Sequence, residues 1–94
     1  EVDGMVTIRL RTLADCKDFV DLVGSGKYEE CTVDVYLGEQ RSKVTVDGKS
    51  LLGIMSLEPN KELRITVSSF DSDLATELEH KIGEKFGGQE HGCN

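Results

Sequence analysis

Four short segments of the chain alternate between apolar and polar residues, which is the two-residue period of a strand with one buried face. These segments span residues 5–10, 31–37, 43–46 and 62–67. In the first of them, Val6, Ile8 and Leu10 share one side. Because each strand has a single apolar face, we expect one sheet that is buried on one side and less covered on the other.

Segments with helical spacing lie between the strands. Thr12 followed by Asp15 predicts a helix start, and an apolar stripe continues from there to a Gly-Ser-Gly stop. A short second helix is predicted to begin at Ser50, and a third at residues 71–73, where acidic side chains suit the positive end of a helix. The apolar side of the third helix consists of Leu74, Leu78, Ile82 and Phe86.

The order strand, helix, strand, strand, helix, strand, helix is typical of an α+β fold. It predicts an open-faced sandwich, in which three helices cover one face of a four-stranded antiparallel sheet. From pattern alone, a small ferredoxin-like domain is an equally good interpretation. We expect one domain over residues 1–94, ordered at about 5–87, with a tail at 88–94. The first residue is Glu1 rather than methionine, so a fragment of a longer protein is also compatible with the sequence.

The charge of the chain argues against two classes of partner. It has 18 acidic and 11 basic residues, a net charge of -7. Nucleic-acid phosphates and an anionic membrane surface would both be repelled, whereas a basic protein would not. No apolar run approaches the ~20 residues that span a bilayer, and no signal peptide is visible. Cys16, Cys31 and Cys93 show no pairing pattern, so we expect reduced thiols and a cytoplasmic protein.

Residues 49–57 form the most distinctive stretch, because it is too apolar for an ordinary surface helix. Ser50 is a natural N-cap, and that end of a helix also favours negative charge, including a phosphate. We predict that Lys49, Leu51, Leu52 and Met55 form a surface patch for a protein partner. The alternative is a buried connecting helix with a plain, unmodified N-cap serine.

This stretch, Lys-Ser-Leu-Leu-Gly-Ile-Met-Ser-Leu, resembles the regulatory segment of HPr, the histidine-containing phosphocarrier of the bacterial sugar phosphotransferase system. Residues 6–12 resemble the first strand of that family, Phe19-Val20 its first helix and residues 62–67 its fourth strand. The resemblance covers about residues 5–87 and favours the open-faced sandwich over the ferredoxin-like alternative. It implies phosphorylation of Ser50 by an ATP-dependent kinase and docking on transcriptional regulators.

The chain departs from the family where the phosphocarrier chemistry resides. The family has Gly-Leu-His-Ala-Arg-Pro-Ala between its first strand and first helix, and that histidine carries the phosphate. The corresponding segment here, residues 11–17, has no histidine and no proline, and Asp15 would repel an incoming phosphate. Whether this connection is shorter than in the family depends on which residues are aligned, Phe19-Val20 or Lys27-Tyr28.

Other reactive residues have plainer interpretations. Cys16 lies near a helix start, which can activate a thiol, but it falls on the apolar stripe and is better explained as buried and inert. His80 lies within the last helix on a mostly polar face, as a solvated histidine would. His91 and Cys93 make at most half of a zinc site. We therefore predict no catalytic residues, no metal and no cofactor.

The leading hypothesis is an HPr-like protein without phosphohistidine carrier activity, acting as a regulatory or protein-interaction module that phosphorylation of Ser50 could switch. Its partners would be proteins, including a serine kinase and a transcriptional regulator, and it would not be an enzyme. One alternative is a phosphocarrier with a displaced acceptor, such as His80. Another is a domain of a larger protein with an unrelated binding role.

Overall fold

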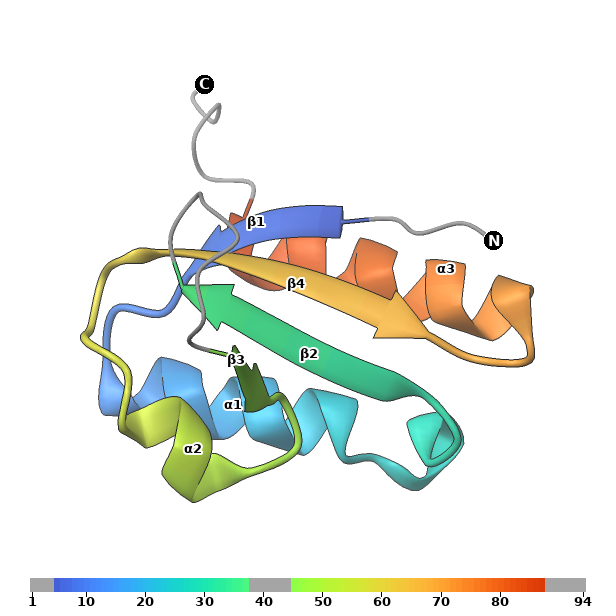
Figure 1. Ribbon diagram of the computed structural model, residues 1–94, viewed down its shortest axis with the longest axis horizontal. Helices are drawn as coiled ribbons and strands as arrows, with labels where there is room; N and C mark the ends of the chain where they lie inside the picture. The colour runs from blue at the N-terminus through green and yellow to red at the C-terminus, as the bar shows by residue number, and fades with distance from the viewer. Residues whose placement is uncertain (1–4, 38–44, 88–94) are drawn as a thin grey trace.

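The computed structural model describes residues 5–37 and 45–87, which form four strands and three helices (Figure 1). In chain order these are β1 (Met5–Arg9), α1 (Leu13–Val23), β2 (Thr32–Leu37), β3 (Thr45–Asp47), α2 (Leu51–Met55), β4 (Glu62–Ser68) and α3 (Ser72–Ile82). A 3₁₀ turn (Gly26–Tyr28) follows α1, and a π turn (Gly83–Gly87) extends α3.

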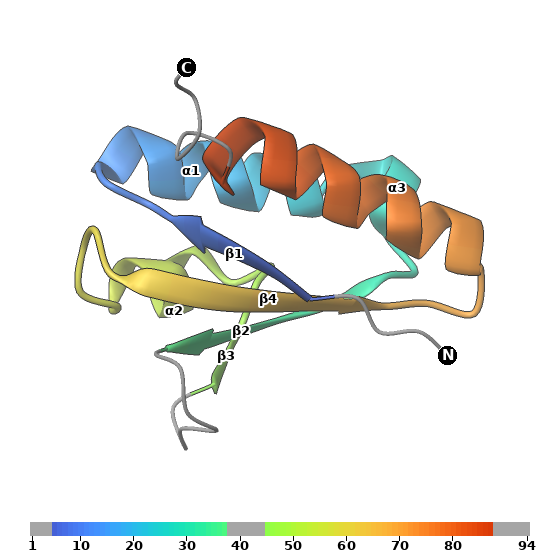
Figure 2. The same cartoon turned by 90° about the horizontal axis from the view of Figure 1, so that it is seen from above.

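The strands form one antiparallel sheet in the order β1-β4-β2-β3. Within it, Ile65 of the central strand β4 lies opposite Val6 of β1 and Val35 of β2. The helices α1 and α3 run along one side of the sheet, and the short helix α2 packs against α1 and β3 (Figure 2). The predicted α+β open-faced sandwich is thereby confirmed.

The core lies between the sheet and its helices, where the alternation in the sequence placed it. Buried strand residues are Ile8, Val33, Val35, Leu63, Ile65 and Val67, and Leu10 and Cys31 are buried directly next to the ends of β1 and β2. From the helix layer, Phe19 and Phe86 meet edge to face with their ring centroids 5.7 Å apart. Burial of each such large side chain contributes about 1.5–3 kcal/mol, so this layer supplies much of the stability of the fold.

The helix boundaries follow the predicted caps. The Thr12 hydroxyl accepts from the Asp15 amide, and the Asp15 carboxylate accepts from the Thr12 amide, which completes a capping box. Gly24 ends α1, and Asp71 caps α3 through its bonds from the Asp73 and Leu74 amides.

The third strand differs from its prediction. We expected a strand over residues 43–46, but β3 reaches Asp47, which pairs with Asp34, and the turn begins at Gly48. The amide of Gly48 donates to the Val33 carbonyl at 2.8 Å, which extends the contact with β2 by one residue. Residues 43 and 44 and the predicted tail at 88–94 lie outside the described residues.

Gly48 lies too close to β2 to carry a side chain. A Cβ built there would lie 2.5 Å from Cγ1 of the buried Val33, whereas one at Gly26 would meet nothing within 4 Å. We therefore expect Gly48→Ala to lower the free energy of unfolding by about 1–3 kcal/mol through overpacking. Gly26→Ala, the matched control, should stay within about 0.5 kcal/mol of the parent. Urea unfolding of both variants checks this, and equal stabilities would contradict the described packing of Gly48.

Candidate functional site

Ser50 occupies the N-cap position of α2, as predicted. Its Oγ accepts a hydrogen bond from the Gly53 amide at 3.2 Å, and its backbone is extended. The side chain is half-buried, because Gly53 lies against Val46 of β3 and holds the start of the helix close to the sheet. Ser50 is therefore a structural cap in the unmodified protein, whatever further role it has.

Lys49 is held by the fold rather than projected into solvent. Its Nζ donates to the carbonyls of Tyr28 at 2.9 Å and Glu29 at 3.2 Å, and its amide donates to Asp47 Oδ1 at 2.9 Å. The same Tyr28 is anchored at its other end, where its hydroxyl donates to Glu77 Oε2 at 2.7 Å. Lys49 thus connects the start of α2 to the 3₁₀ turn and, through Tyr28, to α3.

The Tyr28 hydroxyl lies in an environment that disfavours its ionisation. Burial, followed by its hydrogen bond to Glu77, raises the pKa of Tyr28 to about 12. Glu77 also forms an ion pair with Lys27 at 2.7 Å, and hydrogen bonds from Lys27 and then Tyr28 lower the pKa of Glu77. The contact of Tyr28 with Glu77 is therefore present throughout the neutral pH range.

The apolar residues of α2 divide between core and surface. Ile54 is 1% exposed, whereas Leu51, Leu52 and Met55 are 37%, 79% and 43% exposed. Leu51 and Leu52 lie four and three positions before Met55, so both neighbour it on the helix surface. A helix of this length is not stable alone, so α2 depends on Ile54 and its cap for its position.

Leu13 is a surface residue that the sequence analysis missed. It begins α1 and is 63% exposed. Leu13 and Met55 line the same pocket, which brings the start of α1 beside α2. We refer to Leu13, Leu51, Leu52 and Met55 as the α1–α2 apolar face. Leu13 directly follows the N-cap Thr12, and nothing in this local pattern indicated that its side chain would be exposed.

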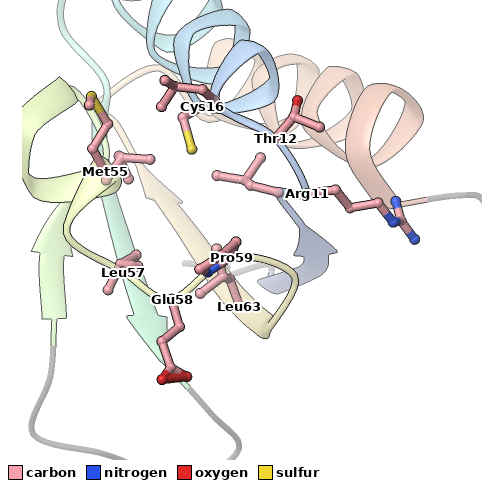
Figure 3. A pocket seen from close by; sticks show the side chains of 11 residues that line it. Arg11, Thr12, Cys16, Met55, Leu57, Glu58, Pro59 and Leu63 are labelled. Atoms are coloured by element: carbon pink, nitrogen blue, oxygen red, sulfur yellow. The ribbon is translucent and has the colours of Figure 1, made fainter.

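A pocket of about 250 Å³ opens between the start of α1, the end of α2 and the turn that follows it (Figure 3). Its buried lining comes from Leu10, Ile54 and Leu63, and its half-buried lining from Cys16 and Leu57. The Cys16 sulfur points into this space, whereas the guanidinium of Arg11 and the carboxylate of Glu58 point away from it (Figure 3). The side chains that line the pocket are therefore mainly apolar, and the Cys16 thiol is a weakly polar group among them.

The Cys16 thiol is a poor nucleophile. Its burial, followed by the nearby charge of Asp15, raises its pKa above the ordinary value of 9.0. The thiol is therefore protonated at neutral pH, but it is half-buried beside the pocket rather than buried as the sequence predicted. Cys31 is buried in the core, and Cys93 and His91 lie outside the described residues.

The structure brings no histidine to the α1–α2 apolar face within residues 5–37 and 45–87. Leu10, Arg11 and Thr12 connect β1 to α1. His80 is exposed on α3, with its Nδ1 3.7 Å from Glu84 Oε2. Since α3 packs over β1 and β4 while α2 lies at β3, His80 is remote from Ser50. Within the described part of the chain, no three metal-ligating side chains of His, Cys, Asp or Glu converge, and no helix is long and apolar enough to cross a membrane.

Comparison with solved structures identifies the fold. HPr-C-His from Thermoanaerobacter tengcongensis superposes with a TM-score of 0.59 and 20% identity, over 89% of this chain and 92% of the other. The phosphocarrier protein HPr from Bacillus anthracis str. Ames superposes with a TM-score of 0.54 and 23% identity, over 84% of this chain and 93% of the other. The chain has the HPr fold. No family model matches it, and no curated protein does.

The HPr fold was the expectation from residues 49–57, and the superpositions confirm it over most of the chain. At these identities the likeness establishes the architecture and leaves the activity to be argued from the residues themselves. Phe19 and Val20, which resemble a dipeptide of the family's first helix, lie in α1.

A substitution of Lys49 tests whether this residue stabilises the fold or is available to a partner. Lys49→Met removes the donor to two carbonyls, and we expect the free energy of unfolding to fall by about 1–2 kcal/mol. The control is Lys61→Met, since Lys61 makes a 3.5 Å ion pair with the exposed Glu58 and the loss of that pair should cost less than about 0.5 kcal/mol. Thermal or urea unfolding measures both. If Lys49→Met leaves the free energy of unfolding unchanged, the Lys49 ammonium is available to a partner instead.

Proposed function

We propose that this protein is a regulatory or protein-interaction module that docks a protein partner through its α1–α2 apolar face. The observation that carries the proposal is the exposure of Leu13 and Met55, which line one pocket from two adjoining elements, together with the exposure of Leu52 three positions before Met55 on α2. Single exposed leucines are ordinary, but apolar side chains gathered around a cavity are typical of interaction sites. In this proposal the protein is a binding module of the cytoplasm and has no catalytic residues.

Ser50 is the position at which we propose that docking is switched. A phosphate there would add about -1.5 to -2 charge at the start of α2, next to Leu51 and Leu52. In the modifying step the Ser50 Oγ would attack the γ-phosphorus of ATP, ADP would leave, and the hydroxyl proton would pass to a base of the kinase. The resemblance of residues 49–57 to the HPr regulatory segment supports this site. It also supports a serine kinase and a transcriptional regulator as partners.

The alternative of a phosphocarrier is favoured by the likeness of the fold to two solved HPr structures. A displaced acceptor would have to be His80 among the described residues. That side chain lies within α3, where the backbone amides are used by the helix, and Glu84 beside it would repel a phosphoryl group. The proposed module therefore agrees better with the geometry than a carrier does.

Intact mass after two incubations distinguishes these functions. One incubation contains ATP with an HPr serine kinase, and the other contains phosphoenolpyruvate with the first enzyme of the sugar system. We expect one phosphate with ATP only. Ser50→Ala should abolish the gain. Ser56→Ala should keep it, because Ser56 is the exposed serine at the opposite end of α2, where its Oγ donates to the Gly53 carbonyl.

Loss of the N-cap needs its own control, because Ser50→Ala should cost about 0.5–2 kcal/mol of stability. Circular dichroism at the incubation temperature shows whether the variant remains folded. An acid-labile phosphate gained from phosphoenolpyruvate would contradict the proposal and favour the carrier. If no phosphate is gained from ATP, the proposed switch at Ser50 is wrong. If the phosphate is found on another serine, that serine would be the modified site instead.

A further inference from the structure

The first turn of α2 is held in place by polar contacts more than by burial. Ile54, the buried residue of this helix, lies in its second half, whereas Leu51 and Leu52 of the first turn are exposed. Gly53 follows them, and a glycine within a helix lowers the stability of the helical state. Segments with little buried apolar area are the ones that open locally while the rest of a protein stays folded. We therefore expect this turn to open more readily than the sheet.

Lys49 makes the contacts that tie the first turn to the rest of the fold. Its half-buried side chain places Nζ 2.9 Å from the Tyr28 carbonyl and 3.2 Å from the Glu29 carbonyl, to which it donates. Its amide donates to Asp47 Oδ1 at 2.9 Å. Hydrogen bonds from an ammonium are stronger than those between neutral groups. The residue directly before Ser50 is therefore fixed to a segment some twenty positions earlier in the chain.

The other end of this connection is anchored on α3. Tyr28 is 2% exposed, and its hydroxyl donates to Glu77 Oε2 at 2.7 Å. Lys27 forms an ion pair with the same carboxylate, so two neighbouring residues hold the 3₁₀ turn against α3. The carbonyls that accept from Lys49 are fixed in position by these contacts. We refer to Lys49, Tyr28 and Glu77 as the α2 latch.

Ser50 is poorly placed for modification while the first turn is intact. Its Oγ accepts a hydrogen bond from the Gly53 amide, and its side chain is half-buried. Phosphoryl transfer requires an oxygen lone pair in line with the γ-phosphorus, with space around it for the nucleotide and for the kinase residue that orients the hydroxyl. Unwinding of the first turn releases the Oγ from Gly53 and uncovers it.

We propose that Ser50 is modified from an opened state of the first turn of α2, and that the α2 latch sets how often this state forms. This inference rests on the proposed switch at Ser50 and adds the step that controls it. In the opened state the Ser50 Oγ bonds to the γ-phosphorus of ATP, ADP leaves, and the hydroxyl proton passes to a base of the kinase. Lys49 is a positioning residue in this scheme. When the competent state is rare, the kcat/KM of the kinase rises in proportion to its population.

Amide hydrogen exchange of the unmodified full chain, followed by NMR, tests the latch without a kinase. The amides of Gly53 and Ile54 bond to the Oγ and the carbonyl of Ser50, so their exchange reports opening of the first turn. The amide of Ile65, in the central strand β4, reports unfolding of the sheet. We expect Gly53 and Ile54 to exchange faster than Ile65. Lys49→Met should speed their exchange about tenfold, because it removes a charged donor to two carbonyls.

Two variants separate the latch from a general loss of stability. Val6→Ala trims a partly buried residue of β1, at the opposite edge of the sheet from β3. It should speed exchange of Ile65 and leave Gly53 unchanged, because the opened state of α2 keeps β1 folded. Lys49→Arg keeps a charged donor, so exchange of Gly53 should stay within about threefold of the parent.

Tyr28→Phe extends the test to the modification itself. It removes the bond to Glu77 from a side chain that a kinase cannot touch, because Tyr28 is buried. We expect exchange of Gly53 to rise about two- to fivefold. The initial rate of Ser50 phosphorylation by ATP and the HPr serine kinase, followed by intact mass below the KM for this protein, should rise by the same factor. Val6→Ala should leave that rate unchanged.

Several results would overturn the inference. One is a Gly53 amide that exchanges no faster than that of Ile65 in the parent, and another is exchange of Gly53 that Lys49→Met leaves unchanged or that Val6→Ala raises equally. A constant phosphorylation rate in Tyr28→Phe, despite faster exchange of Gly53, would show that Ser50 is modified without opening. If no variant gains phosphate, the proposed switch is wrong, whereas the exchange measurements decide the latch separately.

Discussion

The capping box at the start of α1 is the interaction on which the site depends. The Asp15 carboxylate accepts from the Arg11 amide at 2.9 Å and the Thr12 amide at 3.3 Å, and the Thr12 hydroxyl accepts from the Asp15 amide. These bonds let the chain turn from β1 into α1 over Leu10, Arg11 and Thr12. As a result Leu10 remains in the core, Leu13 projects outward and Cys16 faces the pocket.

The second element of the site, α2, is positioned by tertiary contacts rather than by its own helix propensity. Ile54 anchors it in the core, Gly53 permits its approach to Val46, and Lys49 ties the chain before it to the 3₁₀ turn. Because packing fixes one side of this short helix, Leu51, Leu52 and Met55 are held on the other.

Local sequence patterns predicted most of the fold. Alternation placed Ile8, Val33 and Ile65 in the core, and the caps at Thr12, Ser50 and Asp71 marked the helix starts, because each signal depends on residues within one turn. The edge strand β3 was less well predicted, since its end is set by pairing with Asp34 rather than by its own sequence.

The site was only partly predictable, because several of its features depend on contacts between residues far apart in the sequence. The exposed leucines of α2 followed from an excess of apolar residues over what so short a helix can bury. The role of Lys49 could not be predicted in this way, because Lys49 bonds to main-chain carbonyls some twenty positions away. A main-chain acceptor is present at every residue and gives no signal in a sequence. The pocket and the contribution of Leu13 arise where α1, α2 and β4 converge, and only the fold brings these together.

The most direct test of the central claim is site-specific photo-crosslinking in the cells that express this protein. A photoreactive phenylalanine analogue would replace Leu52, which is 79% exposed on the α1–α2 apolar face, or Phe70, which is 104% exposed in the turn between β4 and α3. The account predicts a discrete protein adduct from position 52 and none from position 70. Adducts from position 70 alone, or the same products from both positions, would contradict docking through this face.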